Sequence, residues 1–350
     1  MLIFLNLMNK LFLIFMYTNS NKMFFMFILF FSTLISISSN SWFGCWIGLE
    51  INLLSFIPLI SNPNNLLSSE ASLKYFLTQS IASINFLFSI LLKMILMKNF
   101  ELNLFLTLMI NSSLLMKMGS APFHFWFPNI IEGLSWLNCF ILMTWQKISP
   151  MILLSYYFNK NFLIFIMIVN SIIGAIGGLN QTSLRKLMAF SSINNLGWML
   201  AANLISENLW LTYLILYSFL ILIMCFLFNM FNLFFINQLF ILNMNPMIKL
   251  SLMINFLSLG GLPPFIGFFP KWIMINFLIN NKIFILTFIF IMMSLIMLFF
   301  YIRIIYSSFL FNYFKLKWFK IFIKNNTLIY INFFSLISIS GMILSTFFFL

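Results

Sequence analysis

The sequence contains no aspartate, five glutamates and one histidine, and charged residues make up only 7% of its 350 positions. A soluble domain needs far more polar surface than this, so water is not the main solvent of the chain. So few carboxylates exclude an acidic cluster for a divalent metal, and the spacings of phosphate-binding glycine loops and nucleophile elbows do not occur. These absences exclude the standard catalytic motifs of soluble enzymes.

Cysteine is also scarce: Cys45, Cys139 and Cys225 lie far apart, each in an apolar segment, and no pair has the spacing of a metal site. Buried structural thiols are the expected state of such residues. A single histidine, His124, cannot supply the paired axial ligands of a membrane haem. We therefore expect no metal site and no cofactor-binding site on this chain itself.

What the chain has instead is apolar side chains, 63% of the total, and its mean hydropathy is +1.08. Lysine and arginine number 18 and give a formal net charge of +13, which could suggest nucleic acid. A nucleic-acid interface clusters its basic residues on a solvated patch, whereas these stand singly between long apolar runs. We expect membrane lipids, and no nucleic acid, as partners. Heavy use of Phe, Ile, Met and Asn is typical of an AT-rich genome, such as that of an organelle.

Polar clusters divide the chain into about eleven apolar stretches, and a helix needs roughly 20 such residues to cross a bilayer. The expected spans are 22–39, 42–60, 71–97, 103–131, 135–158, 162–178, 186–204, 208–232, 248–279, 283–309 and 328–349. The connectors between them are too short for a soluble domain. We predict an all-α polytopic membrane bundle, with residues 1–21 as an N-terminal extension and residues 22–350 as a single transmembrane domain.

Basic residues are divided unequally between the two sides of this predicted bundle. The side of the N-terminus receives Lys22, Arg185, Lys186, Lys249, Lys315, Lys317, Lys320 and Lys324. The opposite side receives Lys98, Lys160 and Lys282. Because positively charged connectors stay on the cytoplasmic or matrix side, we predict that the N-terminus lies there and the C-terminus on the opposite side.

Two of the expected spans contain helix-breaking residues at mid-depth. One carries Gly119 and Pro122, and the other carries Gly261, Pro263 and Pro264. Proline removes an amide donor and clashes with the carbonyl four residues before it, so each helix should open there. Open backbone persists inside a membrane only where protein or a water-filled cavity satisfies it. Paired breaks in the two halves of a chain indicate an internal repeat, with its transport site at the breaks.

A run of small residues marks a different kind of site. Gly174, Ala175, Gly177 and Gly178 stand at spacings of three and four, which let helices approach closely. We expect this segment to pack tightly against a neighbouring helix.

Glu50 lies about eight residues from both Trp42 and Pro58, or roughly 12 Å of helix either way, which places it near the bilayer midplane. A carboxylate at that depth costs on the order of 3 kcal/mol unless it is paired. The alternative is a protonated glutamate that only packs against its neighbours, although glutamine or serine would serve that purpose at lower cost. Glu50 is therefore a candidate proton carrier.

Three lysines are further candidates. Lys117 precedes the first break, where the carbonyl-rich end of a helix favours a cation; the alternative is a lysine that extends to the lipid headgroups. Lys147 lies about twelve residues into its span, beside a carbonyl that Pro150 leaves free. Lys271 lies in the second broken span, and an interfacial anchor is the alternative there because Trp272 is adjacent.

Lysines and a glutamate in a row can pass protons if water links them, because the charge of each group affects the protonation of the next. His124 could join such a row, since an unperturbed histidine titrates near neutrality, or it could be a hydrogen-bonded packing residue. The predicted proton path consists of Glu50, Lys117, Lys147, Lys271 and His124.

The segments that contain these charges and breaks are long and distinctive: residues 46–58, 70–79, 117–128, 144–147, 174–194 and 259–272. In this order they resemble the chain 2 subunits of NADH:ubiquinone oxidoreductase (respiratory complex I), a mitochondrially encoded family, in their insect-like form. The resemblance covers residues 22–310. It implies an antiporter-like fold with inverted repeats in the mitochondrial inner membrane, where the distribution of basic residues predicts the N-terminus on the matrix side.

The same resemblance implies a core membrane-arm subunit of a proton-pumping NADH:ubiquinone reductase, which moves protons along a central line of charges. FMN, iron–sulfur clusters and ubiquinone would be held by other subunits, and the partners would be other membrane-arm and accessory subunits. By motif, Glu50 matches the family's carboxylate beside a broken helix and Lys117 its partner lysine. Lys147 matches the central lysine, and Lys271 the lysine of the second broken helix.

One position departs from the family pattern. Insect-like relatives usually have histidine where this chain has Asn195, and asparagine can orient water but cannot carry a proton at that site. Two other interpretations of the buried charges stay open. One is a free-standing cation/proton antiporter, and the other is a structural spacer whose buried ion pairs only fix helix packing.

Overall fold

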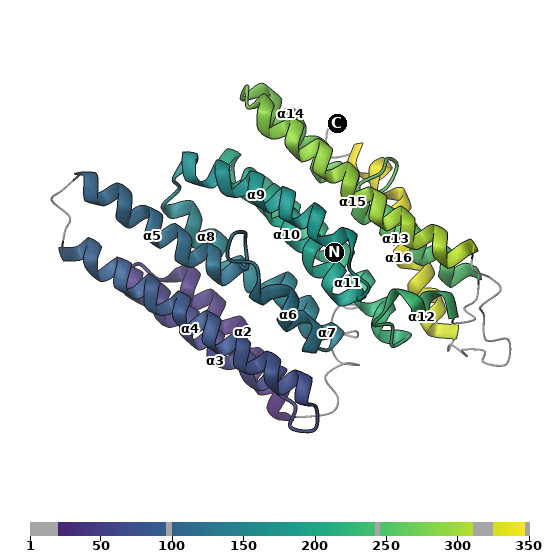
Figure 1. The fold of residues 1–350 in the computed structure, drawn as a ribbon, viewed down its shortest axis with the longest axis horizontal. Helices are drawn as coiled ribbons and strands as arrows, with labels where there is room; N and C mark the ends of the chain where they lie inside the picture. The colour runs from purple at the N-terminus through teal and green to yellow at the C-terminus, as the bar shows by residue number, and fades with distance from the viewer. Residues whose placement is uncertain (1–19, 96–99, 242–245, 311–324, 347–350) are drawn as a thin grey trace. The chain divides into compact units, whose positions relative to one another are not determined.

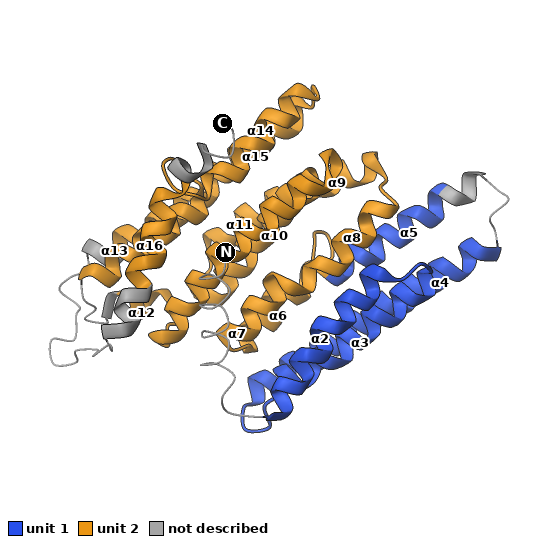
Figure 2. Ribbon diagram, turned by 180° about the vertical axis from the view of Figure 1, so that it is seen from behind, with its two compact units in different colours: residues 1–117 blue, residues 118–350 orange. Residues whose placement is uncertain are grey.

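The structure, a computed structural model, describes residues 20–95, 100–241, 246–310 and 325–346. Its described secondary structure is helical apart from one isolated antiparallel bridge, between Ser183 and Phe235. The chain divides into two compact units, Met1–Lys117 and Met118–Leu350, which Figure 2 colours blue and orange. Residues 1–19 of the expected N-terminal extension lie outside the described residues, and so do Lys315, Lys317, Lys320 and Lys324, which precede the last expected span.

The described helices of the first unit are coloured purple to blue in Figure 1. They are α2 (Ser20–Ser38), α3 (Trp42–Ile60), α4 (Leu66–Ile95) and α5 (Phe100–Met118), whose last residue begins the second unit. α3 packs against both α2 and α4. A Cβ atom on Gly48 would lie 2.7 Å from the backbone nitrogen of Ser36, so glycine is what allows α2 and α3 to approach this closely.

The second unit contains the remaining described helices, teal to yellow in Figure 1. They are α6 (Trp126–Gly133), α7 (Trp136–Met143), α8 (Ile148–Tyr156), α9 (Lys160–Leu179), α10 (Leu184–Ile205), α11 (Glu207–Met230), α12 (Ile236–Ile241), α13 (Pro246–Gly260), α14 (Phe268–Asn280), α15 (Phe284–Leu310) and α16 (Asn325–Thr346). α10 packs against α6, α9, α11 and α14, and most of its side chains are buried. It therefore forms the centre of this unit.

The glycine-rich end of α9 makes the close contact that its spacing predicts. A Cβ atom on Gly174 would lie 2.5 Å from the backbone nitrogen of Asn194 on α10, and one on Gly177 would lie 2.4 Å from the ring of Phe190. These distances are shorter than van der Waals contact, so no larger residue fits without moving α9 away from α10.

Several contacts fasten the N-terminal end of α10 to neighbouring segments. The guanidinium of Arg185 donates to the Leu134 carbonyl at 2.8 Å and lies 4.6 Å from the ring of Phe234. The ammonium group of Lys186 forms an ion pair of 2.7 Å with Glu132. These two cations, which the sequence indicates as markers of membrane orientation, also join α10 to α6 and to the segments that follow α6 and α11.

Both predicted helix breaks are present. α5 ends at Met118 and α6 begins at Trp126, while α13 ends at Gly260 and α14 begins at Phe268. Each break starts with a glycine in the left-handed region, Gly119 at φ 70° and Gly261 at φ 82°. A side chain at either position would strain the backbone.

The helices agree with the expected spans in place but not all in length. Every expected span overlaps a described helix, and α3 matches its expected range, 42–60. Within the described residues seven helical stretches are long and apolar enough to cross a membrane, one of them the interrupted stretch Trp136–Tyr156 of α7 and α8, and three more are apolar but shorter. The chain is thus an all-helical, multi-pass membrane protein, and about eleven crossings stay a prediction.

Candidate functional site

Glu50 and Lys117 belong to the first unit and interact there. Glu50 is half-buried on α3, and Lys117, in the last turn of α5, is 7% exposed. The carboxylate acts electrostatically on the ammonium group, although the two form no ion pair within 4.0 Å. Glu50 thus acts on Lys117 electrostatically without holding it in an ion pair.

The end of α5 is supported by a side chain from α4. The amide nitrogen of Gln79 donates to the carbonyl of Lys117 at 3.1 Å. Helix ends leave their last four carbonyls without helical donors, and a buried end needs such a partner. Gln79 therefore helps to hold Lys117 in place at the point where the helix stops.

His124 lies in the non-helical segment between α5 and α6. Its ring is buried, with Nδ1 3.3 Å from the carbonyl oxygen of Pro122 and its centroid 4.3 Å from that of Phe125. In the same segment the amide of Ala121 donates to the side-chain oxygen of Asn170 on α9, at 2.6 Å. Protein groups thus satisfy part of the backbone that the break opens, as a break inside a membrane requires.

Lys147 is the most deeply buried of the candidate lysines, with 1% of its side chain exposed. It ends a short 3₁₀ turn, Trp145–Lys147, that interrupts the helical path between α7 and α8. Its ammonium nitrogen donates to the Ser192 carbonyl on α10 at 3.3 Å and lies 5.6 Å from the ring centroid of Tyr217. Among the residues that the structure describes, no carboxylate forms an ion pair with it.

The end of α13 is completed by Lys271, which is 8% exposed on α14. The amides of Gly261 and Leu262 donate to the carbonyls of Ser258 and Leu257, at 3.1 and 3.3 Å, in the pattern of a Schellman motif. The ammonium group of Lys271 donates to the next two carbonyls, those of residues 259 and 260, at 3.3 and 2.9 Å.

All four carbonyls at the end of α13 therefore have donors, two from the turn and two from one lysine. This ammonium group points into the break rather than toward the headgroups, and the adjacent Trp272 is 41% exposed. The geometry is that of a charge held at a helix end, where the helix dipole also favours a cation.

Asn195, the departure from the family pattern, has hydrogen-bond partners of its own. Its side-chain oxygen accepts from the hydroxyl of Tyr213 at 3.0 Å, and its amide donates to the Ser191 carbonyl at 3.0 Å. The position therefore holds a polar link between α10 and α11.

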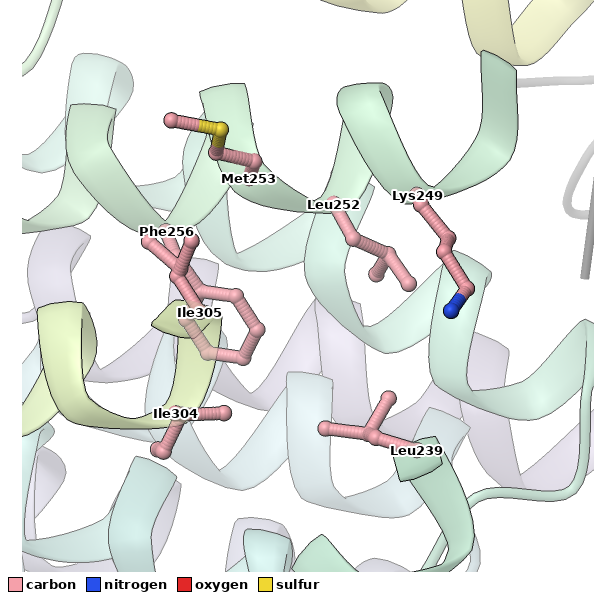
Figure 3. Close-up of a pocket in the computed structure, with 7 residues that line it drawn as sticks. All are labelled: Leu239, Lys249, Leu252, Met253, Phe256, Ile304 and Ile305. Carbon is pink, nitrogen blue, oxygen red and sulfur yellow. The ribbon is translucent and has the colours of Figure 1, made fainter. Parts of the chain in front are cut away.

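One pocket and the question of a metal site lie apart from the candidate proton path. A pocket lined by residues of α12, α13 and α15 contains six apolar side chains and Lys249 (Figure 3). The sequence assigns Lys249 to the basic side of the bundle, and it is not one of the candidate path residues. Within the described residues no group of three or more His, Cys, Asp or Glu side chains is placed to hold a metal ion.

The structure thus brings Glu50 and Lys117 together in one unit and buries Lys147 and Lys271 in the other. Sequence reasoning overlooked the 3₁₀ turn at Lys147, because glycine is absent from it and the nearest proline is Pro150. It also overlooked the polar groups around this lysine. The signal for them was present: four polar residues interrupt an apolar span at 191, 192, 194 and 195.

Comparisons with known proteins agree on one family. The family described as NADH:quinone oxidoreductase/Mrp antiporter, transmembrane region, matches residues 39–297. NADH-ubiquinone oxidoreductase chain 2 of Anopheles gambiae is 53% identical over 307 residues, which are 86% of this chain and 89% of that protein. The same chain of Aedes aegypti is 53% identical over 337 residues, 93% of this chain and 97% of that protein.

A solved structure shares the fold. A chain of respiratory complex I from Thermus thermophilus superposes with a TM-score of 0.81 at 18% identity, over 93% of this chain and 79% of that chain. The chain therefore belongs to the NADH:quinone oxidoreductase/Mrp antiporter family of membrane subunits, within its NADH-ubiquinone oxidoreductase chain 2 group.

Proposed function

We propose that this chain is a core membrane-arm subunit of a proton-pumping NADH:ubiquinone oxidoreductase, and that it translocates protons through Glu50, Lys117, Lys147 and Lys271. The observation that carries the proposal is the burial of three lysines at or beside interruptions of apolar helices. An ionisable group inside a membrane protein costs free energy, and such groups mark ion and proton pathways. The proposed coupling to NADH oxidation and ubiquinone reduction is supported by the name of the relatives, NADH-ubiquinone oxidoreductase chain 2.

Each proposed carrier is held in a different way. Lys117 is influenced by the carboxylate of Glu50 without being locked to it. Lys147 has two aromatic rings and a carbonyl around its ammonium group, and Lys271 has two carbonyls. A change of charge at one group alters the protonation of the next, so protons can advance stepwise when quinone reduction elsewhere perturbs the first. His124 is a further candidate beside the first break.

The finer architecture belongs to the same proposal. We propose about eleven crossings, roughly one for each stretch of 20 apolar residues, with inverted repeats centred on the two breaks. The match to residues 39–297 runs across the boundary between the units, which supports a single transmembrane domain over residues 22–350. Both breaks begin with a glycine at positive φ and have proline three residues later, as related repeats would.

We further propose the mitochondrial inner membrane as the location, with the N-terminus in the matrix. Other membrane-arm and accessory subunits are the proposed partners, with membrane lipids around them. FMN, iron–sulfur clusters and ubiquinone are placed on other subunits, since this chain offers one histidine and three buried cysteines far apart in sequence. The location and partners are supported by the relatives' names.

The test is proton pumping by the assembled complex in liposomes. Replacing Lys147 with methionine or Glu50 with glutamine should lower the number of protons pumped per NADH oxidised, because each substitution removes a carrier but keeps the side-chain size. NADH oxidation with a water-soluble electron acceptor should be unchanged, because that reaction does not use the membrane arm.

Matched controls are available on exposed positions. Lys160→Met removes the same charge from the exposed start of α9, and Glu70→Gln removes a carboxylate that pairs with Lys74 at the exposed start of α4. Both controls should pump normally. Wild-type pumping in Lys147→Met and Glu50→Gln would contradict the proposal.

The structural-spacer alternative assumes buried ion pairs. The two ion pairs that the described residues form are Glu70 with Lys74, which is exposed, and Glu132 with Lys186, which is partly exposed. The candidate lysines Lys117, Lys147 and Lys271 thus form no ion pair of that kind with another described residue. A free-standing antiporter is distinguished by purification, since it would be active without the partners of a complex that oxidises NADH.

A further inference from the structure

We propose that Tyr217 and Tyr301, together with water that joins them, relay protons between Lys147 and Lys271. The inference rests on the proposed function, because it assumes that both lysines carry protons. Its basis is a series of polar groups in the second unit that extends from one lysine toward the other, with water proposed for the gaps between them. Lys147 belongs to the 3₁₀ turn Trp145–Lys147, and the other groups belong to the described helices α10, α11, α13, α14 and α15.

The first half of the series surrounds Lys147. Its ammonium nitrogen lies 5.6 Å from the ring centroid of Tyr217 and donates to the backbone carbonyl of Ser192. The hydroxyl of Tyr217 lies beside the side chain of the same serine. The Ser192 hydroxyl donates its proton to the Ala189 carbonyl within its own helix. Its oxygen can therefore act toward Tyr217 only as a hydrogen-bond acceptor.

The second half approaches Lys271. The hydroxyl of Tyr301 lies beside the side chain of Ser191, and the two tyrosines are close enough to interact electrostatically. A Cβ atom on Gly260 would lie 3.7 Å from the ring of Tyr301. The carbonyl of this glycine is the one that accepts from Lys271 at 2.9 Å. Tyr301 thus reaches the helix end that holds the second lysine.

Both tyrosine hydroxyls are buried and short of partners. Tyr217 is 4% exposed and Tyr301 is 1% exposed. Neither hydroxyl oxygen makes a hydrogen bond of acceptable geometry within the described residues. A buried hydroxyl without a partner is unfavourable, and water is the usual partner when protein groups do not supply one. Two such hydroxyls between two lysines indicate a hydrated link rather than a packed apolar gap.

The proton transfer balances without any change in the tyrosines. The Nζ–H bond of the Lys147 ammonium breaks, and water passes a proton on to the hydroxyl oxygen of Tyr217, which releases its own proton through water toward Tyr301. Tyr301 likewise accepts one proton and releases another, and the amine of Lys271 binds the last. Each hydroxyl ends as it began, one lysine loses a charge and the other gains it. The reverse transfer uses the same steps.

The experiment compares Tyr217→Phe and Tyr301→Phe with Tyr306→Phe in the assembled complex in liposomes. Phenylalanine keeps each ring and removes only the hydroxyl, and Tyr306 is an exposed tyrosine on the same helix as Tyr301. We expect quinone-linked proton pumping to fall by at least about tenfold in the first two variants. Their solvent deuterium isotope effect should rise, because proton transfer becomes limiting, and the third variant should behave as wild type.

Two results separate this relay from the proposed function. Suppose that Lys147→Met does not pump protons, while both tyrosine variants pump normally with an unchanged isotope effect. That result would overturn the relay and leave the proposed function standing. Normal pumping in Lys147→Met would overturn both. If a tyrosine variant does not assemble, Ser191→Ala and Ser192→Ala remove the neighbouring acceptors with a smaller change. Unchanged pumping and isotope effect in those variants would then count against the relay.

Discussion

Lys147 and Lys271, the buried candidate lysines of the second unit, differ in which backbone carbonyls accept hydrogen bonds from their ammonium groups. Lys271 supplies the donors for two carbonyls at the end of α13, where the helix itself has none left. Lys147 donates to the carbonyl of Ser192 in the middle of α10, where the helix supplies a donor of its own. Removal of the two side chains should therefore have different structural effects.

We predict that Lys271→Met loosens the break between α13 and α14. Two buried carbonyls would lose their donors, at about 1–3 kcal/mol each. Hydrogen–deuterium exchange of the assembled complex should be faster at the amides of Gly261 and Leu262. The matched change Lys147→Met should leave exchange at these amides unaltered. Equal exchange in wild type and Lys271→Met would show that the ammonium group does not support this turn.

At the scale of elements, the fold depends on how closely helices approach. α9 and α10 meet where Gly174 faces the backbone of Asn194, and α2 and α3 meet where Gly48 faces Ser36. The first contact adjoins the polar segment of α10 that surrounds Lys147. Separation of these helices would move that segment relative to its lysine.

We predict that Gly174→Ala lowers the stability and yield of the assembled complex. The added methyl group would lie 2.5 Å from a backbone nitrogen, and overpacking of this kind costs about 1–3 kcal/mol. Gly260→Ala is the control, because the nearest atom to its Cβ position is a leucine side chain at 3.5 Å. Thermal unfolding of the purified complex measures both. A tolerated Gly174→Ala would mean that α9 and α10 can separate freely.

Sequence patterns predicted the elements well where their cause is local. Polar residues around Trp42 and Ile60 delimit α3, and prolines and glycines mark both breaks, because each acts on its own stretch of backbone. α12 was not expected, since six residues are too few for a recognisable helical pattern. The charged candidates stood out within apolar runs. The tyrosines near Lys147 did not, because hydroxyls are common in such helices and only the packing of α10, α11 and α15 brings these together.

At the scale of the whole molecule, we predict that most of the net charge of +13 serves membrane orientation. The lysines assigned to the proposed path account for three of the basic residues, and much of the rest falls in predicted connectors on one side. The native cysteines Cys45, Cys139 and Cys225 are all buried. This allows the orientation to be tested with cysteines introduced at exposed positions.

We predict that Asn64→Cys reacts with a membrane-impermeant maleimide only from the matrix side, and Lys160→Cys only from the opposite side. Both positions are exposed, and the connectors that contain them fall on opposite sides if the N-terminus lies in the matrix. Labelling of sealed vesicles of each orientation measures this. Labelling of both cysteines from one side would require a different number of crossings between them.

The fastening of α10 has a consequence for how a transport cycle could work. Arg185 and Lys186 tie its N-terminal end to the connectors beside α6 and α7, and the side chain of Asn203 donates to the Met151 carbonyl near its other end. We expect a helix that is held at both ends to keep its position during transport. Movement should occur instead in the two breaks that begin with glycine, so that these segments shift relative to a fixed α10.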